Sequence, residues 1–84
     1  MNKEITIDLG TISKVKQFVH ITEEFESEID VISGRYTVDA KSIMGLFSLN
    51  ILEPLIVRIN SENEEEIKSF NRVMEEFKYE KNEC

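Results

Sequence analysis

The side chains best suited to chemistry in this 84-residue sequence are three hydroxyls and one imidazole: Thr11, Ser13, Ser42 and His20. Ser42 follows an alternating segment and precedes an apolar one, so we expect it where a strand gives way to a short helix. A serine at that position caps the helix and contributes on the order of 1 kcal/mol. A phosphate there would also be favoured by the helix dipole. Ser42 is therefore a candidate for capping and for regulatory phosphorylation.

Three apolar side chains follow Ser42 at one-turn spacing: Ile43, Met44 and Phe47. They cannot all face inward on a short helix, and methionine and phenylalanine suit adaptable docking surfaces. We predict that they bind a protein partner. Packing in the core is the alternative interpretation, but Leu46 and Leu49 are better candidates for that role.

His20 is the only histidine. The apolar positions around it recur at helical spacing, at Ile12, Val15, Val19 and Thr22. His20 then points nearly opposite this stripe and should be exposed in mid-helix, where no backbone N–H group is free to hold a phosphate. These residues therefore favour a surface histidine without a role over a phosphate carrier.

Composition and motifs exclude several other classes of function. Ten lysine and arginine residues against seventeen acidic ones give a net charge of −7, which argues against nucleic-acid and membrane binding and favours partners with a positive surface. No glycine-rich phosphate loop, metal-ligand spacing or catalytic triad occurs, so we expect no cofactor. The one cysteine, Cys84, and the absence of a signal-like or membrane-spanning apolar run predict a reducing cytoplasm.

The hydrophobic pattern predicts four strands and three helices in the order β-α-β-β-α-β-α. Their expected ranges are 5–7, 12–25, 29–31, 36–38, 42–49, 55–59 and 64–77, with a hairpin turn at Ser33-Gly34. Strand 55–59 is the most apolar and should be central. Thr11 can cap the first long helix, while Ser61 and Glu64 match a capping box for the last. We expect the charged tail from Lys78 to fray.

This order predicts an α+β two-layer sandwich in one small domain spanning residues 1–84. The aromatic residues of the two long helices should help to fill its core: Phe18, Phe25, Phe70 and Phe77.

The run Lys41-Ser42-Ile43-Met44-Gly45 resembles the corresponding segment of HPr, the histidine-containing phosphocarrier of the bacterial sugar phosphotransferase system. The resemblance extends without a gap from Tyr36 to Ile59 and includes both long helices. It implies a four-stranded antiparallel open-faced sheet with three helices on one face, and a protein that is not an enzyme. It also implies that Ser42 is a regulatory phosphorylation site and that Ile43, Met44 and Phe47 contact an HPr kinase-like enzyme or a transcriptional regulator.

The resemblance breaks at the active-site signature Gly-Leu/Ile-His-Ala-Arg-Pro, where this sequence reads Leu9-Gly10-Thr11-Ile12-Ser13-Lys14. Thr11 falls at the phosphohistidine position and Ser13 at the arginine position. A phosphothreonine lacks the transfer potential of a phosphoramidate, and Ser13 cannot supply the guanidinium fork that binds phosphate.

We therefore predict a regulatory or interaction protein, similar to the catabolite-repression type of HPr, that is not a histidine phosphocarrier. Two alternatives remain open: a phosphocarrier that uses His20, and a diverged HPr fold that binds an unrelated protein partner without phosphorylation.

Overall fold

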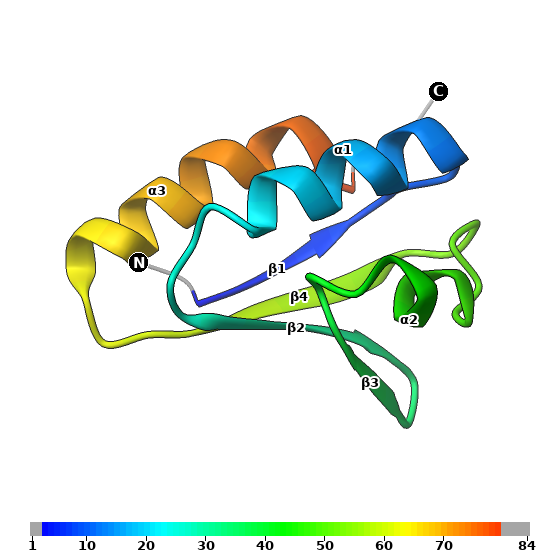
Figure 1. The fold of residues 1–84 in the computed structure, drawn as a ribbon, viewed down its shortest axis with the longest axis horizontal. Helices are drawn as coiled ribbons and strands as arrows, with labels where there is room; N and C mark the ends of the chain where they lie inside the picture. The colour runs from blue at the N-terminus through cyan, green and yellow to red at the C-terminus, as the bar shows by residue number, and fades with distance from the viewer. Residues whose placement is uncertain (1–2, 80–84) are drawn as a thin grey trace.

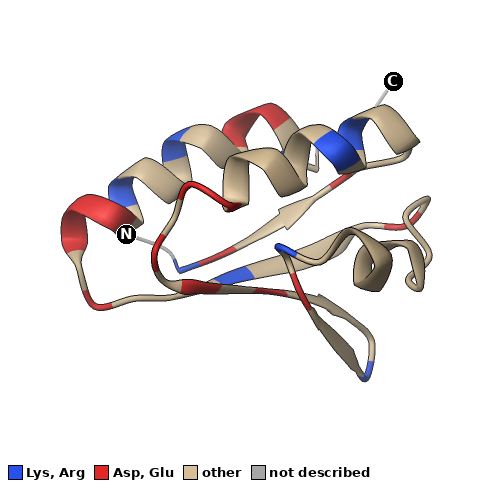
Figure 2. Cartoon of the chain, viewed as in Figure 1, with Lys and Arg blue, Asp and Glu red and all other residues tan. Residues whose placement is uncertain are grey.

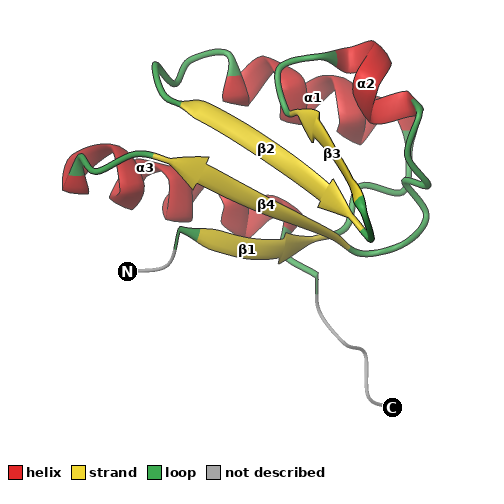
Figure 3. Ribbon diagram, turned by 90° about the horizontal axis from the view of Figure 1, so that it is seen from below, coloured by secondary structure: helices red, strands yellow, loops and turns green. Residues whose placement is uncertain are grey.

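The computed structural model describes residues 3–79 of the chain. Its elements follow the predicted order: β1 (Glu4–Ile7), α1 (Ile12–Thr22), β2 (Glu28–Ser33), β3 (Tyr36–Asp39), α2 (Ile43–Phe47), β4 (Leu55–Asn60), α3 (Glu64–Met74) and the 3₁₀ helix η1 (Glu75–Phe77). The helices α1 and α3 lie side by side over one face of the sheet, and α2 lies at one end, near the start of α1 (Figure 1). Among residues 3–79, no helix covers the opposite face of the sheet (Figure 3).

The four strands form one antiparallel sheet in the order β1-β4-β2-β3 (Figure 3). The most apolar strand, β4, is therefore an interior strand, as its composition predicts. Its side chains alternate strictly, with Leu55, Val57 and Ile59 buried beneath the helices. The hairpin between β2 and β3 turns at Gly34, whose φ of 60° is readily available to glycine.

The helix α1 ends three residues earlier than predicted, at Thr22, and Phe25 lies in the following loop. Glu24 N and Phe25 N donate to carbonyls three residues back, which tightens the last turn. The cause is the acidic run that begins at Glu23, because carboxylates oppose the dipole at a helix C-terminus. Phe25 is consequently half-buried against the core instead of fully inside it.

The capping box predicted for α3 is wrong. Asn63 is the N-cap, and its side-chain oxygen accepts hydrogen bonds from Glu65 N and Glu66 N. Ser61 is buried two residues earlier, where its hydroxyl accepts from Asn63 N at 3.0 Å. An asparagine adjacent to the helix displaces the serine because its carbonyl reaches both N–H groups at once.

The core is continuous between the sheet and the long helices. Phe18 and Phe70 are fully buried, and Phe18 packs edge-to-face on Phe77 with ring centroids 5.5 Å apart. Ile12 is an exception to the predicted stripe, because it is 60% exposed in the first turn of α1. The stripe meets the sheet only from Val15 onward.

The segment after η1 pairs with the edge strand β1. Asp8 N donates to Phe77 O at 2.7 Å, and Tyr79 N donates to Thr6 O at 2.9 Å. The prediction that the tail frays from Lys78 is therefore wrong for Lys78 and Tyr79. Cys84 lies outside the described residues.

Candidate regulatory and docking site

Ser42 is the N-cap of α2, as predicted. Its hydroxyl oxygen accepts a hydrogen bond from Gly45 N at 3.2 Å, and its backbone is extended with φ −103° and ψ 105°. The side chain is exposed. The hydroxyl is thus bound to its own helix through a lone pair while the residue stays open to solvent.

Gly45 explains how α2 fits so closely against β3. A Cβ atom at this position would lie 3.2 Å from Ser42 Oγ and 3.3 Å from Val38 Cβ. A residue with a side chain would therefore be crowded against the Ser42 hydroxyl and against Val38 of β3. The glycine keeps the Ser42 hydroxyl over the first turn of α2.

The lysine that precedes Ser42 is directed elsewhere. Lys41 Nζ donates to Phe25 O at 2.6 Å, so the ammonium group binds the loop after α1. Lys41 N donates to Asp39 Oδ1 at 2.9 Å, which fixes the turn between β3 and α2. The approach to Ser42 is consequently set by backbone geometry and not by a free neighbouring cation.

The three apolar residues predicted to form a docking patch differ in their exposure to solvent. Met44 is 77% exposed and Phe47 is 40% exposed, whereas Ile43 is half-buried against the core. Leu46 is fully buried and Leu49 is half-buried, in line with the core role predicted for them. The exposed patch on α2 therefore consists mainly of Met44 and Phe47.

Two further apolar side chains are exposed: Leu52, which the sequence analysis did not single out, and Ile12, which it placed in the apolar stripe of α1. Leu52 is 76% exposed in the loop before β4, and Ile12 is exposed at the start of α1. A hydrogen bond of 2.9 Å from Gly10 N to Ile51 O joins these two loops. Leu52 stands beside Ile51 in a short apolar run, so the sequence alone does not show which of the two faces solvent, and the structure leaves Leu52 exposed and Ile51 half-buried.

Thr11 and Ser13 lie at the N-terminus of α1, on this same end of the molecule (Figure 1). Thr11 is the N-cap, and its hydroxyl oxygen accepts from Lys14 N at 3.1 Å. Both side chains are exposed. The structure therefore confirms the cap and places two neutral hydroxyl residues where α1 begins.

His20 is exposed, as its position on the helical wheel predicts, but the prediction that it lies in mid-helix is wrong: α1 ends at Thr22, which places His20 in the last turn. It follows Thr11 by nine residues, which is about 13 Å along a helix. The imidazole and the free N–H groups at the helix start are therefore too far apart to share one phosphate.

Residues 3–79 contain neither a group of metal-ligating side chains nor a membrane-spanning helix. Within this range no three or more His, Cys, Asp or Glu side chains are grouped so that they could ligate a metal. No helix in the same range has both the length and the apolar character required to cross a membrane.

Comparisons with known proteins agree on one family. A family model described as the PTS HPr component phosphorylation site matches residues 12–78. The structure is similar to that of HPr-C-His from Thermoanaerobacter tengcongensis, with a TM-score of 0.69 and 27% identity over 90% of this chain and 91% of that chain. It is also similar to phosphocarrier protein HPr from Bacillus anthracis str. Ames, with a TM-score of 0.64 and 26% identity over 81% of this chain and 87% of that chain. The comparison with curated proteins found no match.

Proposed function

Because the chain belongs to the PTS HPr family, we propose that it is a regulatory protein of the phosphotransferase system that acts by docking to other proteins. Members of this family are phosphocarriers and not enzymes, and they interact with other proteins of the system. In this proposal, phosphorylation of Ser42 controls docking, and the chain transfers no phosphate through a histidine.

One observation carries the proposal: an exposed hydroxyl begins the helix that presents the exposed Met44 and Phe47. A phosphoryl group on Ser42 would add about −1.5 to −2 charge at neutral pH, two residues before Met44 and five before Phe47 on the same short helix. A partner that covers Met44 and Phe47 would then also have to desolvate this charge, which costs binding free energy unless the partner supplies a cation. A kinase could therefore switch docking without altering the fold.

The start of α1 supports the second part of the proposal, that the chain transfers no phosphate through a histidine. A carrier needs an imidazole at a helix N-terminus and a cation that holds the transferred phosphate. This chain has Thr11 and Ser13 there, and the sole histidine, His20, lies in the last turn of α1. We therefore propose that the carrier site of the family is absent from this member.

The net charge of −7 supports partners with a positive surface. An HPr kinase-like enzyme and a transcriptional regulator are the partner classes that we propose, in a bacterial cytoplasm. No nucleic acid, membrane or cofactor has a role in this proposal.

The phosphorylation of Ser42 is tested by incubating the chain with an HPr kinase and ATP and mapping the product by mass spectrometry. We expect one phosphate, on Ser42, which Ser42→Ala abolishes and Ser13→Ala leaves in place. Ser13 is the control because it is also an exposed serine in the first turn of a helix, two residues after the N-cap Thr11. Modification at another residue, or none where an authentic HPr is modified, would contradict the proposal.

The absence of a carrier role is tested with phosphoenolpyruvate and the general enzyme of the phosphotransferase system. We expect no acid-labile phosphate on this chain under conditions that label an authentic HPr. Label on the chain that disappears in His20→Gln would show instead that His20 is a carrier at a displaced site.

A further inference from the structure

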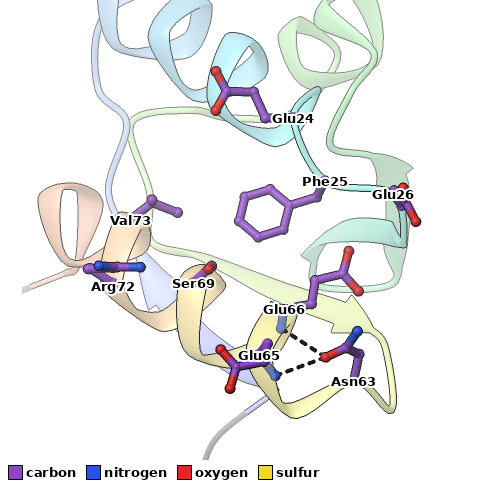
Figure 4. Close-up of a pocket in the computed structure, with 9 residues that line it drawn as sticks. All are labelled: Glu24, Phe25, Glu26, Asn63, Glu65, Glu66, Ser69, Arg72 and Val73. Atoms are coloured by element: carbon purple, nitrogen blue, oxygen red, sulfur yellow. Dashed lines mark hydrogen bonds between the residues drawn. The ribbon is translucent and has the colours of Figure 1, made fainter.

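A groove of about 490 Å³ lies between the loop after α1 and the helix α3 (Figure 4). Phe25 and Val73 supply its apolar surface, and four carboxylates line it, from Glu24, Glu26, Glu65 and Glu66. None of its lining residues belongs to α2 or to the first turn of α1. The groove is therefore separate from the site proposed above.

The apolar surface of the groove is held in place from several sides. The Phe25 ring is half-buried and packs edge-to-face on Phe70, with ring centroids 6.4 Å apart. Its carbonyl accepts from Lys41 Nζ, and Ser27 N and Oγ donate to the Glu66 carboxylate. The loop that carries Phe25 is thus fixed to α3 and to the β3–α2 turn, so the groove exists before any partner binds.

The carboxylates around the groove fall into two kinds. Glu66 is satisfied by Ser27. Within residues 3–79, the carboxylates of Glu24, Glu26 and Glu65 make no hydrogen bond or ion pair, although all three are exposed. Figure 4 shows them around the Phe25 ring, and Figure 2 shows how acidic residues gather at this end of the two long helices. The Phe25 ring thus lies in a groove whose lining carries three carboxylates without a partner among the described residues and one cation, Arg72.

We propose that this groove binds a single arginine side chain from an extended segment of a protein partner. A guanidinium group can stack on the face of Phe25 while its N–H groups reach the neighbouring carboxylates. Its methylene stem would pack on Phe25 and Val73. A volume of 490 Å³ accommodates one or two side chains and not a whole helix.

Arg72 limits the charge that the segment can carry. It lines the groove two turns of α3 after Glu65, which is about 10 Å along the helix axis. A second cation in the segment at that end would meet a like charge. The groove therefore fits a single arginine flanked by neutral or apolar residues better than it fits a polybasic chain.

The test is a titration of the ¹⁵N-labelled full chain with the blocked tripeptide acetyl-Ala-Arg-Leu-amide, followed by NMR. We expect saturable shifts of the amide signals of Phe25, Ser69 and Val73, with a Kd in the millimolar range. The same peptide with citrulline in place of arginine should leave these signals unshifted. Shifts confined to α2, or equal shifts with citrulline, would overturn the proposal.

Matched variants separate specific binding from net charge. We expect Glu24→Gln with Glu65→Gln to weaken peptide binding about fivefold, since each exposed charge contributes modestly. The pair Glu53→Gln with Glu75→Gln removes the same charge from exposed positions outside the groove and should leave the Kd within twofold. Equal weakening by both pairs would show attraction to overall charge only. Spermidine binding at the same amides with a lower Kd than the peptide would also overturn the assignment to a protein segment.

Discussion

At the scale of single residues, Ser42 is both the cap of α2 and an exposed hydroxyl that a kinase can reach. Its oxygen accepts a hydrogen bond from Gly45 N, and its side chain remains exposed. A carboxylate or phosphate oxygen can accept the same hydrogen bond, because an N-cap needs only an acceptor. The cap is therefore compatible with a regulatory modification, since an anion at Ser42 keeps the interaction that begins α2.

This leads to a prediction for the stability of Ser42 variants in urea unfolding. Ser42→Ala should lower the free energy of unfolding by about 1 kcal/mol, because it removes the acceptor for Gly45 N. Ser42→Asp should leave it nearly unchanged. Ser13→Ala is the control for loss of an exposed hydroxyl and should change it by less than about 0.5 kcal/mol. Equal stability of Ser42→Ala and Ser13→Ala would contradict the capping role.

At the scale of elements, one carboxylate joins the loop after α1 to the start of α3. The Ser27 hydroxyl and, to a lesser extent, the Ser61 hydroxyl and the Ser27 N–H stabilise the charged form of Glu66, which lowers its pKa from 4.5 to about 2. Ser27 N donates to Glu66 Oε2 at 3.0 Å. Because the folded pKa lies below the unfolded value, this interaction stabilises the fold above pH 4.5 and is lost as the pH falls toward 2.

Glu66→Gln should therefore lower the free energy of unfolding at pH 7 by about 1–2 kcal/mol, as expected for a hydrogen bond to a charged group. The difference between the wild-type chain and this variant should shrink as the pH falls from about 4.5 toward 2. Glu65→Gln is the matched control, because it removes the neighbouring exposed carboxylate, which accepts no hydrogen bond within the described part of the chain. A difference that is independent of pH would show that Glu66 acts through packing and not through its charge.

At the scale of the whole molecule, the long helices are held to the sheet by aromatic residues that differ in burial. Phe70 is fully buried, whereas Phe25 is half-buried at the edge of the groove and contacts Phe70 through its ring. The two residues have the same side chain in very different environments. They therefore allow the contribution of the central core to be compared directly with that of its margin.

Phe70→Ala should lower the free energy of unfolding by about 3–5 kcal/mol, since it leaves a cavity beneath α3. Phe25→Ala should cost less than half as much, because its site is already open to solvent and leaves no closed cavity. Both values come from denaturant unfolding monitored by circular dichroism. A loss for Phe25→Ala that equals or exceeds that for Phe70→Ala would contradict this description of the core.

Much of the architecture could be predicted from local pattern in the sequence. Period-2 and period-3.6 repeats fixed the order of strands and helices, the interior position of strand 55–60, and the outward direction of His20. The caps at Thr11 and Ser42 also followed from residue type and position. The helices, strands and caps depend on interactions among residues within a few positions of one another, and the interior position of β4 follows from its apolar composition, so the sequence by itself determined them.

Other features were decided only by the tertiary structure, because they depend on residues far apart in the chain. Ser27 and Glu66 are 39 residues apart, and the pairing of Tyr79 with Thr6 joins the two ends of the described segment. The exposure of Ile12, within an apolar stripe that is otherwise buried, depends on where α1 meets the sheet. No periodic signal encodes such contacts, since each forms only after the chain has brought distant segments together and met the entropy cost of closing the loop between them.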